Sequence, residues 1–211
     1  MSRLRDIDFY LVTYSSVSRK GSLSDVKNAV DAGCRFVQYR EKNKTKNEMI
    51  KEATELKKIC EGKALFIVDD HVDVALAVGA DGVHIGQKDV SVEDARRLLG
   101  SDKIVGLTVH NVEEAVKAEK LGADYVGIAP VFKTDTKGDS DEPCGVDMIK
   151  KISENISLPI VAVGGIDKNN VKSVIYSGAD GVVSVSAVLK SNDVNREVKD
   201  FIRIINEVKS L

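Results

Sequence analysis

The sequence predicts a single α/β domain, a (β/α)8 TIM barrel formed by residues 1–211, and three observations lead to this expectation. Apolar runs rich in Val and Ile alternate with amphipathic stretches along the whole chain. One phrase recurs four times, as AGCRFV, VGADGV, LGADYV and SGADGV, and in each copy a Gly ends a helix before a buried strand begins. The apolar runs are continuous rather than alternating, which is typical of parallel strands buried on both faces.

Eight strands and eight helices follow from this pattern in chain order. The strands are expected at residues 8–13, 36–41, 64–69, 82–86, 104–109, 125–130, 159–164 and 181–186. The helices are expected at residues 23–33, 45–60, 72–78, 91–99, 111–121, 145–155, 168–177 and 193–208, with Ser24, Ser91 and Asn111 as N-caps. An open doubly wound sheet is the main alternative. Closure is favoured because no GxGxxG motif follows the first strand and because eight strands are expected.

Composition and charge argue against several classes of function. Lys and Arg total 31 against 33 Asp and Glu, so no strong overall charge would attract nucleic acid or an anionic membrane. No apolar run approaches the ~20 residues that span a bilayer, and the N-terminus lacks the pattern of a signal peptide. Cys34, Cys60 and Cys144 fit neither a metal pattern nor a disulfide framework, so we expect reduced thiols in a cytoplasmic protein.

Polar side chains gather where the predicted strands end, which is where barrels of this kind carry their chemistry. Gln38, Arg40 and Lys42 alternate along the end of the second strand and would therefore share one face. Arg40 and Lys42, together with Lys137, are cations suited to phosphate oxygens. Asp70 follows the third strand and would therefore lie beside the cations at the end of the second strand.

Two kinds of anion site are indicated by this arrangement. Asp70 and Asp89 follow neighbouring strands. So sparse a set of oxygen ligands suits Mg²⁺, which usually completes its coordination with water and with substrate phosphate oxygens. Gly165 and the pair Val185-Ser186 follow the last two strands, where barrels often hold a phosphate on backbone N–H groups. The first site would suit a diphosphate and the second a monophosphate.

Each feature also has a purely structural interpretation. Arg40 and Lys42 could be a solvated strand end, and Asp70 could cap a helix. Residues 133–142 could be a plain polar loop, and His84 is interpreted as an interior histidine with hydrogen-bond partners rather than a ligand. The functional interpretation is favoured because the unusual polar residues all fall at the same end of the predicted strands.

The same stretches resemble the thiamine-phosphate synthase (thiamine-phosphate pyrophosphorylase) family along nearly the whole chain. The matching motifs are VQYREK (37–42), IVDDHVDVA (67–75), GADGVHIGQKD (79–89), GLTVH (106–110), GADYVGIAPVFKTDTK (122–137), AVGGI (162–166) and GADGVVSVS (178–186). The chain departs from the family pattern at Asp69, where Asn is usual, at His71, where Arg is usual, and at Thr108, where Ser is usual.

The resemblance implies a transferase on a (β/α)8 barrel, with Mg²⁺ as cofactor and two small phosphorylated substrates. It implies that 4-amino-2-methyl-5-hydroxymethylpyrimidine diphosphate is joined to 4-methyl-5-(2-hydroxyethyl)thiazole phosphate. Pyrophosphate would depart with the help of Mg²⁺, the thiazole nitrogen would attack, and thiamine phosphate would form. A homodimer is left open, and neither nucleic acid nor a membrane is expected as a partner.

Carried over by position, the resemblance also implies residue roles. The residues implied in catalysis are Arg40, Lys42 and Lys137, and those implied in metal binding are Asp70 and Asp89. The residues implied in binding the pyrimidine diphosphate are Gln38, Tyr39, Arg40, Glu41, Lys42, Asp69, Thr108 and Lys137. The residues implied in binding the thiazole phosphate are Thr134, Asp135, Thr136, Gly165, Val185 and Ser186.

Three other functions compete with this one. A thiazole tautomerase-like isomerase on the same barrel would need a proton shuttle and no diphosphate site, and the retained cations and carboxylates argue against it. A non-catalytic relative that binds thiamine phosphate would not need the carboxylates Asp70 and Asp89. A sugar-phosphate epimerase would lack the paired cations of VQYREK.

Overall fold

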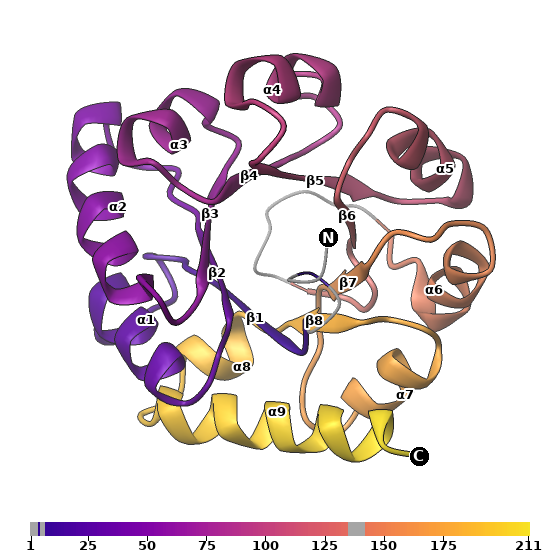
Figure 1. Ribbon diagram of the computed structural model, residues 1–211. Helices are drawn as coiled ribbons and strands as arrows, with labels where there is room; N and C mark the ends of the chain where they lie inside the picture. The colour runs from indigo at the N-terminus through magenta and orange to yellow at the C-terminus, as the bar shows by residue number, and fades with distance from the viewer. Residues whose placement is uncertain (1–3, 5–6, 135–141) are drawn as a thin grey trace.

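Eight parallel strands close into a barrel in the computed structural model, which describes residue 4 and residues 7–134 and 142–211 (Figure 1). Neighbouring strands pair in chain order, and β1 pairs with β8 through Phe9↔Val182 and Tyr10↔Val183, which closes the cylinder. The predicted (β/α)8 barrel is therefore confirmed, and the open sheet is excluded. The strands are β1 (Phe9–Val12), β2 (Phe36–Tyr39), β3 (Leu65–Asp69), β4 (Gly82–Ile85), β5 (Ile104–Val109), β6 (Tyr125–Ile128), β7 (Ile160–Val163) and β8 (Gly181–Val183).

A ring of helices covers the outer face of the barrel (Figure 1). The expected helices are α1 (Ser22–Asp31), α2 (Lys46–Cys60), α3 (Val72–Val78), α4 (Val92–Leu99), α5 (Val112–Lys120), α6 (Gly145–Ser153), α7 (Val171–Tyr176) and α9 (Val194–Lys209). A short helix, α8 (Ser186–Leu189), was not expected. It begins where the eighth strand was predicted to continue, because the pairing of β8 with both neighbours ends at Val183. Val185 is therefore the N-cap of α8 and not a strand residue.

Side chains alternate between two apolar layers along the strands. On β1, Phe9 and Leu11 point outward and pack in the large cluster between the barrel and the helices. Tyr10 and Val12 point inward and pack in a smaller cluster that fills the barrel interior, together with Tyr125 of β6. These two layers explain the continuous apolar runs in the sequence, because both faces of each strand are buried.

Helix starts were predicted with mixed success. The Ser91 and Asn111 side chains each accept a hydrogen bond from the backbone N–H three residues further on, so both N-caps are confirmed. Ser24 is not an N-cap, because α1 already begins at Ser22. Thr45 caps α2 in a reciprocal capping box, which was not expected.

The cysteines are free thiols, as expected. Burial raises the pKa of Cys34 to about 12 and that of Cys60 to about 12, so both stay protonated at neutral pH. Within the described parts of the chain, every helix is too short or too polar to cross a membrane.

Candidate functional site

A cavity of about 520 Å³, here called the central cavity, lies in the barrel and is bordered by the segments that follow several strands. All eight strands contribute to its lining, through Tyr10, Gln38, Asp69, His84, Thr108, Gly127, Val163 and Val183. Of the residues singled out from sequence, those that line it are Gln38, Arg40, Asp69, Thr108, Thr134, Gly165, Val185 and Ser186. These eight residues therefore converge on one cavity, of the size that small ligands occupy, whereas Lys42, Asp70 and Asp89 are not among its lining residues.

Two cations at the end of β2 meet two carboxylates at the end of β3. The Arg40 Nε atom lies 3.3 Å from an Asp69 carboxylate oxygen, and the guanidinium stacks over the Tyr14 ring, 5.0 Å from its centroid. The Lys42 ammonium forms a close ion pair with Asp70 and lies 3.9 Å from Asp69. The side chains of Arg40 and Asp69 are mostly buried, which strengthens their attraction relative to a surface pair.

The intervening residues of VQYREK face away from the central cavity. The Tyr39 hydroxyl donates a hydrogen bond to Glu52 of α2 at 2.7 Å, and Tyr39 belongs to the outer apolar cluster. Glu41 is only 4% exposed and is absent from the cavity lining. The two-residue period of a strand sends Tyr39 and Glu41 outward, so the structure does not bring them to the position implied by the resemblance.

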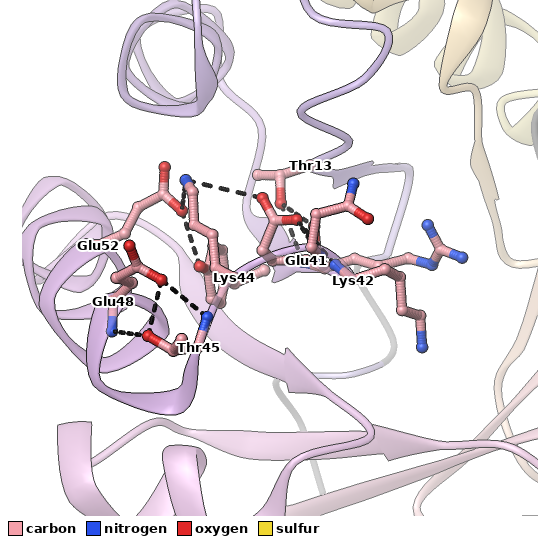
Figure 2. A network of polar contacts seen from close by, with 10 residues as sticks. Thr13, Glu41, Lys42, Lys44, Thr45, Glu48 and Glu52 are labelled. Atoms are coloured by element: carbon pink, nitrogen blue, oxygen red, sulfur yellow. Dashed lines mark hydrogen bonds and ion pairs between the residues drawn. The ribbon is translucent and has the colours of Figure 1, made fainter.

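Glu41 instead anchors the backbone of the β2–α2 loop. Its Oε1 atom accepts hydrogen bonds from the backbone N–H groups of Lys42 and Asn43, both at 2.8 Å. Figure 2 shows this carboxylate in one network with Lys44 and Glu52, in which the Lys44 ammonium lies 3.7 Å from Glu41 and 2.7 Å from Glu52. The Lys42 side chain points away from this network (Figure 2). Glu41 is therefore placed to fix the loop backbone that carries Lys42.

Asp70 and Asp89 are close enough for each carboxyl group to affect the pKa of the other. Asp70 has a φ of +58°, a left-handed conformation that few residues other than Gly adopt, and Asp89 accepts a hydrogen bond from the Gly86 N–H at 2.7 Å. Burial would raise the pKa of Asp70, but the hydrogen bond and charge of Lys42 outweigh it and lower that pKa. Burial raises the pKa of Asp89, and the neighbouring Asp70 charge raises it as well. The hydrogen bond from the Gly86 N–H lowers this pKa but does not outweigh them.

This carboxylate pair is chemically suited to a hard cation. Two neighbouring acidic groups repel each other when both are ionised, and a divalent ion held by them would remove that repulsion. Within the described residues, no group of three or more His, Cys, Asp or Glu side chains is arranged to hold a metal ion. A cation at Asp70 and Asp89 would therefore need water or ligand oxygens to complete its coordination.

A chain of hydrogen bonds crosses the floor of the central cavity. The Tyr10 and Tyr125 hydroxyls are 3.0 Å apart, and the Tyr125 hydroxyl lies 2.9 Å from His84 Nδ1. His84 Nε2 lies 2.9 Å from the Thr108 hydroxyl. The interpretation of His84 as an interior histidine with hydrogen-bond partners is therefore confirmed, and it also lines the cavity.

The opposite side of the cavity is built from backbone and small side chains. Gly165 has a φ of +64°, and a Cβ atom there would lie 2.6 Å from the Lys133 carbonyl oxygen, so no other residue fits. Thr134, Gly165 and Ser186 border both the central cavity and an adjoining groove of about 510 Å³. Lys190 lines that groove, so two ammonium groups, those of Lys133 and Lys190, adjoin this side.

Some expectations cannot be compared with the structure, and some lining residues were not expected. Asp135, Thr136 and Lys137 lie outside the described residues, so their roles stay predictions. Tyr14, which stacks on Arg40, was missed, although it follows the first strand directly and a search of that strand end would have found it. Lys190 was missed because it follows a helix that was not expected.

Comparisons with known proteins show which proteins this chain is similar to. The family described as thiamine monophosphate synthase matches residues 9–188. A thiamine-phosphate synthase of Methanosarcina barkeri is 59% identical over 99% of this chain and 94% of its own length, and one of Methanosarcina mazei is 56% identical over 99% and 87%. The solved structure of a thiamine phosphate pyrophosphorylase from Pyrococcus furiosus superposes with a TM-score of 0.89, at 37% identity, over 99% of both chains.

Proposed function

Because the chain belongs to the thiamine monophosphate synthase family, a family of transferases, we propose that it joins 4-amino-2-methyl-5-hydroxymethylpyrimidine diphosphate to 4-methyl-5-(2-hydroxyethyl)thiazole phosphate. The products would be thiamine phosphate and pyrophosphate. The observation that carries this proposal is the cavity lined by Arg40 and Asp69 on one side and by Thr134, Gly165 and Ser186 on the other, with the Lys42–Asp70 ion pair beside Asp69. A diphosphate would bind on the first side and a monophosphate on the second.

The pyrimidine diphosphate is proposed to contact the ends of β2, β3 and β5. Arg40 and Lys42 would donate hydrogen bonds to the diphosphate oxygens and stabilise the negative charge that builds as pyrophosphate leaves. Gln38 and Thr108 line the same cavity and would contact the substrate. Lys137 keeps its proposed catalytic role on the basis of the resemblance alone.

Mg²⁺ is proposed to bind at Asp70 and Asp89. The proximity and the opposite pKa shifts of these carboxylates support a site that favours a positive ion. When bound, Mg²⁺ would supply charge neutralisation for the leaving pyrophosphate. Asp70 also pairs with the Lys42 ammonium, so the residues that would hold the metal ion lie beside a cation that would bind the diphosphate.

The thiazole phosphate is proposed to bind near Thr134, Gly165 and Ser186, with the Val185 backbone. The electron-rich aminopyrimidine supports a cationic methylene group once pyrophosphate has left. The thiazole nitrogen carries a lone pair and attacks that carbon directly. The protein therefore needs to position the two substrates and stabilise charge, and this chemistry requires no general base.

Incubation of the purified protein with both substrates and Mg²⁺ tests the proposal directly. Thiamine phosphate and pyrophosphate should appear in equal amounts, and Asp70→Asn should reduce the rate about 10²–10³-fold, as loss of a single electrostatic group does in other active sites. Asp73→Asn is the matched control, because Asp73 pairs with Lys46 on the helical surface. Tautomer interconversion without pyrophosphate release would identify an isomerase instead, and binding without turnover would identify a non-catalytic relative.

A further inference from the structure

The hydrogen-bond chain beneath the cavity has only one consistent polarity. Among the residues that the structure describes, the Tyr125 hydroxyl is the one hydrogen-bond partner of the Tyr10 hydroxyl. Tyr10 is 2% exposed, so its O–H group must donate to Tyr125 or remain a buried donor with no acceptor. The Tyr125 oxygen is thus the acceptor in that pair.

The direction of every other hydrogen bond in the chain follows from the first. The Tyr125 O–H group donates to His84 Nδ1, since its oxygen already accepts from Tyr10. A neutral imidazole with an accepting Nδ1 carries its proton on Nε2, which then donates to the Thr108 oxygen. The opposite polarity would leave the Tyr10 O–H group without an acceptor among the described residues. The Thr108 O–H group is consequently directed into the central cavity, which Thr108 lines.

We propose that Tyr125 is a positioning residue that holds His84 in its Nε2–H tautomer and thereby presents the Thr108 hydroxyl to the substrate as a hydrogen-bond donor. The tautomer and the donor polarity stand apart from the proposed function. The identity of the acceptor, a lone pair on the pyrimidine diphosphate, rests on it. The arrangement selects a substrate that offers an acceptor at this point and disfavours one that offers a donor.

The barrel interior is shaped around these rings. A Cβ atom on Gly106 would lie 2.2 Å from Tyr125 Cζ, and a Cβ atom on Gly127 would lie 3.0 Å from His84 Cε1. Two glycines on neighbouring strands therefore make the space in which the tyrosine and the histidine lie. Burial raises the pKa of both Tyr10 and Tyr125, so each hydroxyl keeps the proton that the chain requires.

Nitrogen-15 NMR of the imidazole rings in the ligand-free protein tests the polarity. The chain has three histidines, and a His84→Asn variant identifies the signals of His84. We expect His84 to be neutral, with a protonated Nε2 and an unprotonated Nδ1. A protonated Nδ1 in the unmodified protein would overturn the proposal, and this measurement requires no substrate.

Two one-oxygen deletions sharpen this test. Tyr125→Phe breaks the chain and should give a mixture of His84 tautomers. Tyr10→Phe is the matched control: it removes a hydroxyl 3.0 Å away but leaves Tyr125 as the terminal donor, so the Nε2–H tautomer should persist. The same tautomer in both variants would show that the tyrosine chain does not set the state of His84.

Steady-state kinetics test the donor role of Thr108. Thr108→Val keeps the shape of the side chain without its hydroxyl, and it should raise KM for the pyrimidine diphosphate about tenfold with little change in kcat. Thr108→Ser should restore most of that binding, and Tyr125→Phe should shift KM in the same direction as Thr108→Val. An unchanged KM in Thr108→Val would overturn the donor role. If the unmodified protein forms no thiamine phosphate, the proposed function fails while the NMR result stands.

Discussion

Replacement of Glu41 by Gln should destabilise the protein by about 2 kcal/mol and shift the loop that carries Lys42. The carboxylate accepts two backbone hydrogen bonds of 2.8 Å, from Lys42 and Asn43, and faces the Lys44 ammonium at 3.7 Å. A hydrogen bond to a charged group contributes about 1.5–3 kcal/mol and a neutral one about 0.5–1.5 kcal/mol, so two weakened bonds cost about 2 kcal/mol. The unfolding equilibrium constant would then rise about thirtyfold.

Urea denaturation and steady-state kinetics check the two parts of this prediction. Glu41→Gln should lower kcat/KM for the pyrimidine diphosphate at least tenfold, because the loop backbone that carries Lys42 would shift. The matched control is Glu52→Gln, which also contacts Lys44, at 2.7 Å, but makes no bond to the backbone of that loop. Glu52→Gln should lose stability and keep its activity. Equal activity in the two variants would refute the positioning role of Glu41.

The pH dependence of the stability difference follows from the pKa of Glu41. Burial alone would raise this pKa, but hydrogen bonds from the Asn43 N–H, the Ser15 hydroxyl and the Lys42 N–H outweigh burial and lower it. A carboxyl group whose pKa is lowered by folding stabilises the protein above its unfolded pKa of about 4.3, and the contribution is lost as pH falls through the folded value. The difference between the unmodified protein and Glu41→Gln should be full at neutral pH and should shrink in acid; a constant difference would contradict the assignment.

Three further substitutions test the fold around the site. Gly106→Ala would place a Cβ atom 2.2 Å from Tyr125 Cζ and should lower stability by about 1–3 kcal/mol. Gly127→Ala, whose Cβ atom would have its nearest neighbour at 3.0 Å, should lower stability less. Thermal unfolding that ranked the two variants in the opposite order would contradict the packing argument. Thr45→Ala removes the capping box of α2 and should cost about 1 kcal/mol, and an unchanged melting temperature would show that this cap does not stabilise the helix.

The barrel could be predicted from sequence because its signals are local. Each copy of the repeated phrase places a Gly at the end of a helix, and the strands that follow are apolar on both faces. The order and type of the elements can therefore be predicted without tertiary information. The position of Gln38 and Arg40 was equally readable, because alternation along β2 and the shared mouth of parallel strands fix which side chains meet. The same alternation places Tyr39 and Glu41 outside, although the resemblance grouped them with the substrate contacts.

Contacts between distant elements could not be read from sequence in the same way. The close pairing of Lys42 with Asp70 and the stacking of Arg40 on Tyr14 depend on how loops approach one another above the barrel. The left-handed backbone of Asp70 carries no sequence signal of its own, since the residue is not a glycine. The end of β8 was misjudged because apolar residues continue beyond Val183, where the strand has lost its neighbours.

The ion pairs at the mouth of the barrel mean that the free protein carries its own counterions. Arg40 is matched by Asp69 and Lys42 by Asp70, so an arriving polyanion displaces tethered carboxylates rather than dissolved salt. The affinity for such a ligand should therefore respond weakly to ionic strength, because few mobile ions are set free when it binds. Selectivity among anions then depends on whether an arriving anion interacts more strongly with these arginine and lysine side chains than Asp69 and Asp70 do.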